Sequence, residues 1–347
     1  MAHPGQPLGE PVEPKRRLFS LTALISLGVA GGLLAFLITR FDVDLGAAWR
    51  HIKAANLWYF GGAVAVHYTT FVFRGARWRL LLQNAQQDGA PVPGVFYCSQ
   101  LVLLGWFANA VSWLRLGDAY RAYLYHDEQE ASFSRTIGTI VAERALDAVL
   151  IVVLLVLTVP FLVRAGGDVA WVVLGVAVAL LLLLFGLLGA MTWSRERALR
   201  TLPRWLAEHY DRFQEGTLGS FKRVLPVTCW GLLGWLAEVS RLYLVVKALD
   251  LNIGLALVVF LALSNSLLSL APTPGGFGVV ETGVAGLAVR LSRLSSSAAA
   301  ALVLVDRFIS YVSIIAVGVI LFFWRQVLHR RQPALRRAVS LGGVKDP

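Results

Sequence analysis

The chain has 347 residues, of which 57% are hydrophobic and 15% are charged, and its mean hydropathy is +0.65. A soluble domain averages about 45–50% apolar and about 25% charged residues, so the composition excludes a soluble globular protein and predicts an all-α polytopic membrane protein. The net charge of +11 does not indicate nucleic-acid binding, because the basic residues lie between apolar runs and near the C-terminus, where the positive-inside rule expects them.

A polar, Pro- and Gly-rich stretch (1–17) precedes the first apolar run, at 18–40. This run is longer than the core of a signal peptide and ends without a small-x-small cleavage site, so we expect a membrane helix. A helix needs about 20 mostly apolar residues to cross the hydrocarbon. Further candidate segments follow at 57–83, 94–124, 134–163, 169–193, 226–248, 253–292 and 296–325.

Two of these segments are interrupted. The first, 94–124, contains Gly105 and Asn109 and ends near LRLGD, and the second, 253–292, is cut by PTPGGFG. Pro and Gly at this density break a helix. If all eight segments cross the membrane, the basic loop 194–225 lies outside. If the two broken segments are re-entrant hairpins, six helices cross, and that loop, the N-terminus and the basic tail 326–347 all lie in the cytoplasm, as the positive-inside rule favours.

The six-plus-two arrangement exposes a weak internal repeat within a single transmembrane domain, 18–325. Each broken hairpin follows a helix with a central arginine, Arg77 or Arg241, and precedes a helix with an acid-arginine pair, Glu143-Arg144 or Asp306-Arg307. The two hairpins would open to opposite sides of the membrane. This pattern indicates an inverted repeat, the usual architecture of secondary transporters.

The loop 194–225 has a pattern of its own. Leu202, Trp205, Leu206 and Tyr210 recur at helical spacing, while charged residues mostly take the other faces. An amphipathic helix of this kind is expected in the cytoplasmic interface of the membrane. A soluble connector that packs on neighbouring loops remains the alternative.

Charged residues inside the predicted helices are the strongest functional signal, because each one costs about 2.5–3.5 kcal/mol on insertion scales and needs a partner or a polar cavity. Glu143 and Asp147 stand one turn apart, and Arg144 can pair with Asp147 at i, i+3. One carboxylate could then remain without a partner on this helix. The arrangement fits either a substrate-binding arginine with a balancing or titrating acid, or a structural ion network.

The other buried charges allow similar alternatives. Glu238 and Arg241 are three residues apart and could neutralise each other, and Asp118 and Arg121 could form an ordinary salt bridge after the first break. Arg74, Arg77 and Arg79 lie towards a helix end, where arginine can snorkel to headgroups and Trp78 can anchor at the interface. Snorkelling is expected above all for Arg79.

The second break predicts an anion site. A half-helix that begins after Gly278 would expose backbone N–H groups and the positive end of its dipole inside the membrane, and Gly275, Gly276 and Gly278 would let a ligand approach the backbone. Glu281 would lie in the first turn, where it either caps those N–H groups or holds a proton or a cationic headgroup. The alternative is a tight surface loop.

The chain resembles the lysylphosphatidylglycerol synthase transmembrane-region family through a set of residues that occur in the same order. This family is the flippase-type membrane part of bacterial aminoacyl-phospholipid proteins and their stand-alone relatives. The resemblance covers about residues 20–325. It is carried by Arg77-Trp78, Asn109, Leu116-Gly117-Asp118, Arg121, Glu143-Arg144, Asp147, Glu238, Pro274-Gly275-Gly276-Phe277-Gly278 and Glu281.

Two departures from the family pattern matter. Trp113 stands about where the family often has a proline, so the first break is expected to be softer. No soluble synthase domain follows Trp324, so the resemblance implies translocation without lipid synthesis, in a bacterial cytoplasmic (inner) membrane. We expect no catalytic or metal site and no cofactor: Cys98 and Cys229 lie in apolar runs without CxxC or histidine partners.

The sequence therefore favours a non-enzymatic flippase for an anionic phospholipid, aminoacyl-phospholipid or lipid-linked glycan. Arginines and backbone glycines would bind the headgroup phosphate: Arg77, Arg121, Arg144, Arg241, Arg307, Gly275, Gly276 and Gly278. Carboxylates would balance charge or couple to protons: Asp118, Glu143, Asp147, Glu238, Glu281 and Asp306. The alternatives are an accessory subunit for a separate synthase or glycosyltransferase, and an intramembrane lipid transferase. The lipid's identity and any homo-oligomer stay open.

Overall fold

The computed structural model describes residues 44–86, 91–112, 116–164, 168–271, 273, 276–292 and 294–325. Several predicted features lie outside these residues, namely the stretch 1–17, the first predicted helix at 18–40, the tail 326–347, Trp113, Pro272, Pro274 and Gly275. Within the described residues, every regular element is a helix.

The helices follow the predicted segments closely. In chain order they are α2 (Leu45–Lys53), α3 (Leu57–Ala85), α4 (Val95–Val111), α5 (Gly117–Gln129), α6 (Phe133–Arg164), α7 (Val169–Trp193), α8 (Arg195–Thr201), α9 (Arg204–Gly219), the 3₁₀-helix η2 (Ser220–Arg223), α10 (Val224–Ala248), α11 (Leu255–Leu268), α12 (Val279–Leu291), α13 (Ser296–Arg307) and the π-helix η4 (Phe308–Val312). Helical structure continues after η4 to Arg325.

Local chemistry explains where several helices begin. The side chains of Asp44, Asn56 and Ser295 accept hydrogen bonds from the backbone N–H groups of the first turns of α2, α3 and α13. Such N-caps satisfy donors that have no partner within the helix.

In the part of the chain that the structure describes, four stretches are long and apolar enough to cross a membrane: Phe133–Val163, Val169–Trp193, Arg204–Ala248 and Ser296–Arg325. Helix α3 has 29 residues and packs along α10. The protein is an all-α, multi-pass membrane protein, as the composition predicts.

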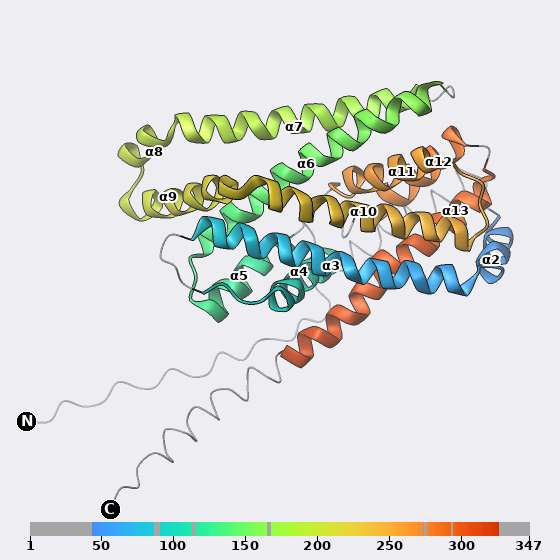
Figure 1. Ribbon diagram of the computed structural model, residues 1–347, viewed down its shortest axis with the longest axis horizontal. Helices are drawn as coiled ribbons and strands as arrows, with labels where there is room; N and C mark the ends of the chain where they lie inside the picture. Colours follow the sequence, from blue (N-terminus) through green and yellow to red (C-terminus); the bar gives the residue numbers. More distant parts are fainter. Residues whose placement is uncertain are drawn as a thin grey trace, which may run out of the picture.

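The two interrupted segments form helical hairpins, α4–α5 and α11–α12. Their helices have 17, 13, 14 and 13 residues, fewer than the about 20 residues that cross the hydrocarbon. Each hairpin also begins and ends on one side of the bundle (Figure 1). The geometry therefore fits two re-entrant hairpins better than eight full spans.

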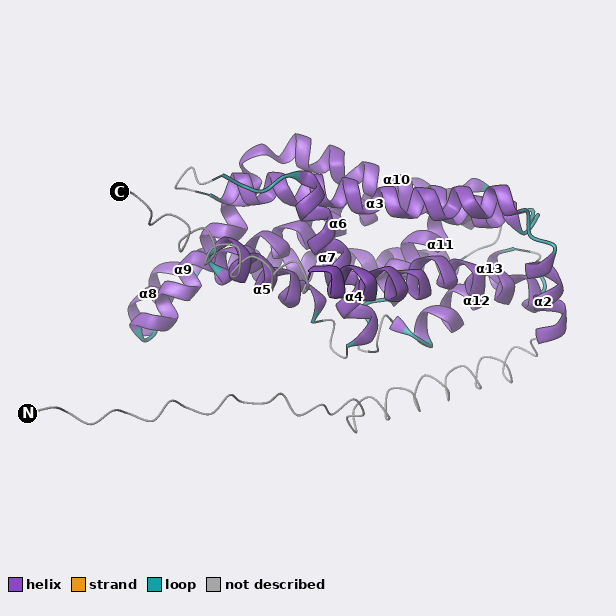
Figure 2. Ribbon diagram, turned by 90° about the horizontal axis from the view of Figure 1, so that it is seen from below, coloured by secondary structure: helices purple, strands orange, loops and turns teal. Residues whose placement is uncertain are grey.

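The two halves of the bundle run in opposite directions. Helices α3 and α10 lie side by side in both views (Figures 1 and 2), and Asn56 N–H donates to the carbonyl of Ala248 at one end while the Asn84 side chain donates to the carbonyl of Ser220 at the other. The two helices are therefore antiparallel. Because each is followed by a hairpin and then a long helix, the predicted inverted repeat is present in the fold.

The hairpins accordingly enter from opposite ends. The α4–α5 hairpin opens at the end where Arg325 pairs with Glu128, and the α11–α12 hairpin opens at the end that holds α2 (Figure 1). Each hairpin contributes to a different apolar cluster, the first with α3 and the second with α10, α13 and parts of α6 and α7. The loop 194–225 and the end of the last helix lie at one end of the bundle, as the six-plus-two topology requires.

The loop 194–225 is helical, as its periodicity predicts. Helix α8 and the first half of α9 project from the end of the bundle (Figure 1), and Trp205 is 65% exposed. The second half of α9 packs closely on α6, where Gly138 and Gly216 bring the two backbones together. The position of the projecting part in a membrane interface stays a prediction.

Candidate functional site

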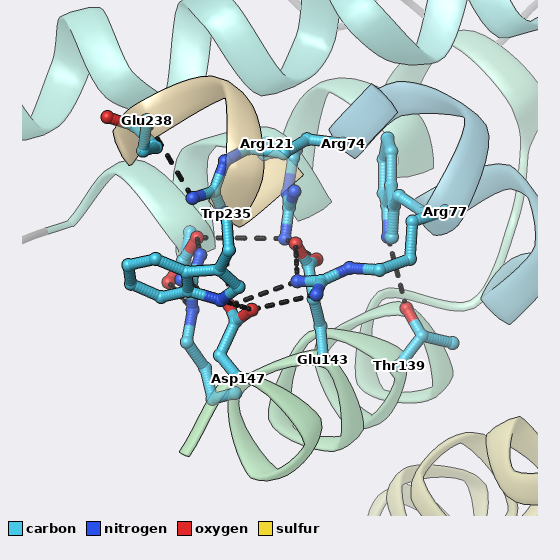
Figure 3. A network of polar contacts seen from close by, with 11 residues as sticks. Arg74, Arg77, Arg121, Thr139, Glu143, Asp147, Trp235 and Glu238 are labelled. Carbon is cyan, nitrogen blue, oxygen red and sulfur yellow. Dashed lines mark hydrogen bonds and ion pairs between the residues drawn. The ribbon is translucent and has the colours of Figure 1, made fainter. Parts of the chain in front are cut away.

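A network of buried charges connects the helices at the centre of the bundle (Figure 3). The guanidinium of Arg77, on α3, donates to both carboxylates that α6 places one turn apart: 2.7 and 3.0 Å to the oxygens of Asp147, and 2.9 Å to Glu143. The side chain of Arg77 is 1% exposed. Arg77 therefore holds α3 to α6.

The first hairpin joins this network through α5. Arg121 donates to the second oxygen of Glu143 at 2.8 Å and stacks over the ring of Trp78, 4.6 Å from its centroid. Asp118, in the first turn of α5, accepts two hydrogen bonds from Arg144, at 3.1 and 3.2 Å. The predicted pairing of Arg144 with Asp147 is also present, at 3.4 Å.

The second repeat has its own pairs. Arg241, on α10, forms ion pairs with Asp306 of α13 and, at 3.0 Å, with Glu238 of its own helix. Arg74 joins the two repeats, since its guanidinium lies 3.8 Å from Asp147 and 3.8 Å from Glu238. Five arginines and five carboxylates thus form one continuous chain.

Equivalent residues of the two repeats form equivalent pairs. The arginine of the first helix binds the acid of the acid-arginine dipeptide, as Arg77 binds Glu143 and Arg241 binds Asp306. The arginine of that dipeptide binds an acid in the first turn of the second half-helix: Arg144 pairs with Asp118, and Arg307 pairs with Glu281 at 2.7 Å. The charges therefore follow the inverted repeat.

Several sequence expectations need correction. Arg74, Arg77 and Trp78 do not snorkel or anchor at an interface, because all three are buried and their partners lie on other helices. Arg79 is half-buried and donates to the carbonyl of Pro93 at 2.9 Å. Glu143 is not left over, since it pairs with Arg77 and Arg121. For Arg74, Arg77, Trp78 and Glu143, the correction arises because a partner comes from a helix distant in sequence.

A cavity of about 320 Å³ lies beside the network, between the two hairpins. The ends of α4 and α11 contribute Asn109 and Asn265, and the segment around η4 contributes Arg307, Ser310 and Tyr311. Charged groups from both repeats also reach it: Arg74, Arg144, Asp147, Glu238 and Arg241. The cavity therefore combines polar groups from both halves of the protein.

One wall of the cavity is apolar. Helix α7 contributes Ala177, Leu180 and Leu184. Only 6% of the most apolar stretch of this helix is buried. In Figure 1, α7 lies along the edge of the bundle next to α6. Helix α7, most of whose other side chains are apolar and exposed, thus lines one side of the polar cavity.

Arg74 and Arg307, which line the cavity, bind their carboxylate partners less fully than the other arginines of the network. Arg74 is held between the rings of Trp106 and Trp235, at 5.0 and 5.7 Å, and its ion pairs of 3.8 Å are longer than hydrogen bonds. Arg307 places its Nε 2.7 Å from Glu281 and leaves one terminal nitrogen, which is buried, without a hydrogen-bond acceptor. The guanidinium of Arg74 can therefore receive an anion in the cavity, whereas that of Arg307 has to turn towards the cavity first.

The N-terminus of α12 is capped by the carboxylate of Glu281. Gly276 and Gly278 adopt positive φ angles of 72° and 86°, which glycine tolerates without a steric cost. The N–H of Gly278 donates to Glu281 at 2.5 Å. Gly276, Gly278 and Glu281 do not line the cavity, so Glu281 takes the capping role that the sequence left as one of two alternatives.

The predicted site residues thus fall into two groups. Arg144, Arg241 and Arg307 line the cavity, together with Asp147 and Glu238. The other predicted charged residues do not line the cavity. They pair with the residues that line it or with each other, and they are Arg77, Arg121, Asp118, Glu143, Glu281 and Asp306.

Sequence reasoning missed Arg74, Trp106, Trp235, Asn265 and Tyr311 as cavity residues. Arg74 stands three residues before Arg77, as Glu238 stands three before Arg241, so the repeat itself could have indicated Arg74. No local pattern distinguishes the two tryptophans from the other aromatic residues of the membrane helices. Among the described residues, no cluster of His, Cys, Asp or Glu is placed to hold a metal ion.

The fold and this cavity define a multi-pass membrane protein built from an inverted repeat with broken hairpins. The family model of the lysylphosphatidylglycerol synthase transmembrane region matches residues 23–318, and the chain belongs to that family.

Two similar proteins come from archaea. A UPF0104 membrane protein of Methanocaldococcus jannaschii is 29% identical over 225 residues, which cover 62% of this chain and 93% of the relative. A UPF0104 membrane protein of Methanothermobacter thermautotrophicus is 24% identical over 314 residues, covering 83% of this chain and 91% of the relative.

Proposed function

We propose that this protein is a non-enzymatic lipid translocator of the cytoplasmic membrane, in which the cavity between the hairpins carries the headgroup of an anionic phospholipid or lipid-linked sugar. The observation that carries this proposal is the position of Arg74, Arg144 and Arg307 around one cavity whose outer wall is a lipid-facing helix. A phosphate in the cavity would receive hydrogen bonds from these arginines, while the acyl chains remain in the bilayer beside α7.

The size and the charge of the cavity support this assignment. Ligand pockets measure about 300–1,000 Å³, and at about 320 Å³ this cavity suits a polar headgroup rather than a whole lipid. The described network pairs each carboxylate with an arginine. The carboxylates are therefore neutralised within the protein, and an anion in the cavity would meet arginines, above all Arg74, whose ion pairs are long.

The same pairing favours charge balance over proton coupling for Asp118, Glu143, Asp147, Glu238, Glu281 and Asp306. Each of these carboxylates lies within ion-pair distance of an arginine, so the protein balances their charges with its own side chains. We therefore expect lipid movement to be insensitive to an imposed proton gradient. A rate that rises several-fold with the gradient would assign coupling to one of these acids.

We also propose that α8 and the projecting part of α9 lie at the cytoplasmic surface, because this end of the bundle carries the basic loop. Labelling of a cysteine placed at Arg204, which is 95% exposed, with a membrane-impermeant maleimide in intact cells tests this orientation. No labelling from outside is expected, and labelling after permeabilisation serves as the control.

The decisive experiment measures transbilayer movement in proteoliposomes. Phosphatidylglycerol, phosphatidylethanolamine and a lipid-linked sugar, each with a fluorescent acyl chain, are tested separately, and dithionite reports the label that reaches the outer leaflet. We expect one lipid class to move. Arg307→Gln should slow this movement roughly tenfold or more, since it removes a charge-assisted hydrogen bond.

Arg204→Gln is the matched control, because it removes an exposed arginine paired only with Glu208. This variant should move lipid at the wild-type rate. If folded wild-type protein moves none of the lipids, the translocator proposal is wrong and an accessory role beside a separate lipid-modifying enzyme takes its place.

A further inference from the structure

The two repeats place one arginine each at the same cavity. Arg144 and Arg307 follow the acids of equivalent dipeptides on α6 and α13, and both line the space between the hairpins. Each is bound by an acid in the first turn of its own hairpin's second helix, Asp118 or Glu281. The repeat thus presents two phosphate-sized cationic positions rather than one.

The two positions are not in the same state. Arg144 donates three hydrogen bonds, two to Asp118 and one to Asp147, whereas Arg307 meets a single carboxylate oxygen, 2.7 Å from its Nε, and leaves one buried terminal nitrogen without an acceptor. Yet Arg144 is the more exposed side chain, at 37% against 13%. In this conformation Arg307 is bound less fully by protein carboxylates than Arg144.

The hairpins explain the difference. Glu281 divides its two oxygens, one to the N–H of Gly278 and one to Arg307, so it cannot satisfy Arg307 fully. In the first hairpin, the N–H of Gly117, the first residue of α5, donates to the Asn109 side chain at 2.8 Å. Asp118 is therefore free to bind Arg144 with both oxygens.

We propose that Arg144 and Arg307 are two successive binding positions for the same lipid phosphate, one accessible from each side of the membrane. This inference rests on the proposed translocator function. Because the repeats are inverted, the hairpin that carries Asp118 opens to one side and the hairpin that carries Glu281 opens to the other. A rearrangement that frees Arg144 from Asp118 and engages Arg307 more fully would reverse the difference between the two positions and pass the phosphate across.

The test uses sided photo-crosslinking. The full-length protein is reconstituted in one orientation, selected with a terminal affinity tag. A short-chain phosphatidylglycerol with a photoactivatable group is added to one side only and irradiated at once in the cold. We compare wild type, Arg144→Gln, Arg307→Gln and the control Arg204→Gln, all checked for folding by their elution and thermal unfolding.

Two sequential positions predict reciprocal losses. One variant should lose crosslinking from one side roughly tenfold or more and keep it from the other, and the second variant should show the reverse pattern. Both should lose transbilayer movement. Arg144→Lys and Arg307→Lys should recover part of each loss, since they keep the charge but not the planar donor geometry.

Other outcomes have distinct meanings. If each variant loses crosslinking equally from both sides, or if neither variant loses any, the two-position model is wrong, while movement in wild type still supports the translocator. If wild type neither moves lipid nor crosslinks from either side, the proposed function fails, and the two-position model fails with it.

Discussion

The two repeats carry the same buried charges but close their hairpin breaks with different groups. In the first repeat, a side chain of the preceding helix, Asn109, reaches across the break to the N–H of Gly117. In the second, a side chain of the following helix, Glu281, turns back to the N–H of Gly278. In the first repeat, Asp118 is therefore free to bind Arg144 with both oxygens. In the second, Glu281 has only one oxygen left for Arg307.

This difference shows how an inverted repeat can become functionally asymmetric without losing its framework. Arg77–Glu143 and Arg241–Asp306 hold equivalent helix pairs, whereas residues one turn away differ: Arg74 corresponds to Glu238, and Asp147 corresponds to Ser310. These four residues all line the cavity. The charges are symmetric where they hold helix pairs together and asymmetric where they line the cavity.

The largest effect is expected from removing a framework arginine. Arg77→Met would leave Glu143 and Asp147 with one buried partner fewer, and Arg241→Met would do the same to Glu238 and Asp306. Loss of one partner from a buried ion pair costs about 3–5 kcal/mol. Thermal unfolding in detergent should show a similar loss for both variants.

Arg204→Met removes an exposed arginine and is the control for this pair. A loss at Arg77 with none at Arg241 would contradict the equivalence of the two frameworks.

The contact between the first helix and the hairpin differs between the repeats. Gly75 packs so closely on α4 that a Cβ would lie 2.2 Å from the Ser99 hydroxyl and 2.6 Å from its backbone nitrogen, whereas the second repeat has Val239 at the equivalent position. Gly75→Ala should cost about 1–3 kcal/mol or more through overpacking, measured by the same unfolding assay.

Gly234→Ala is the matched control, since its Cβ would meet the Arg74 side chain at 3.7 Å, an ordinary van der Waals distance. Equal effects of the two alanines would show that the α3–α4 contact is looser than the structure indicates.

The contacts that close the two hairpin breaks can be tested by substituting one asparagine in each hairpin, Asn109 and Asn265. Asn109→Ala leaves the N–H of Gly117 without its acceptor and should cost about 1–3 kcal/mol. Asn265, near the end of α11, lines the cavity, and no side-chain hydrogen bond is described for it. Asn265→Ala should therefore change stability less but slow lipid movement. Equal stability losses would mean that both breaks are closed by the same kind of contact.

The smallest effect concerns a polar pair found only in the first repeat. Trp78 donates to Thr139 at 3.2 Å, while Leu242 and Leu302 occupy the equivalent positions. Thr139→Val should cost about 0.5–1.5 kcal/mol, the net value of a typical hydrogen bond. Thr69→Val, which removes an exposed hydroxyl bonded only within its own helix, should have no measurable effect on thermal unfolding.

The sequence by itself determined the helical segments, the two broken hairpins and the repeated order of charges. These features depend on local chemistry: a run of apolar residues must be helical in lipid, and Pro and Gly interrupt a helix wherever they cluster. Contacts within one helix were also predictable, as Arg144 with Asp147 and Glu238 with Arg241 show, because residues three apart lie on the same face.

Only the tertiary structure decided which charges meet across helices and which reach the cavity. Arg77 and Arg74 are one turn apart on α3, yet one is enclosed by carboxylates of α6 and the other lies between two tryptophans beside the cavity. The direction and depth of a side chain depend on how α3, α4, α6 and α10 pack together. Helical periodicity gives the face of each residue on its own helix, but not the neighbour that covers that face.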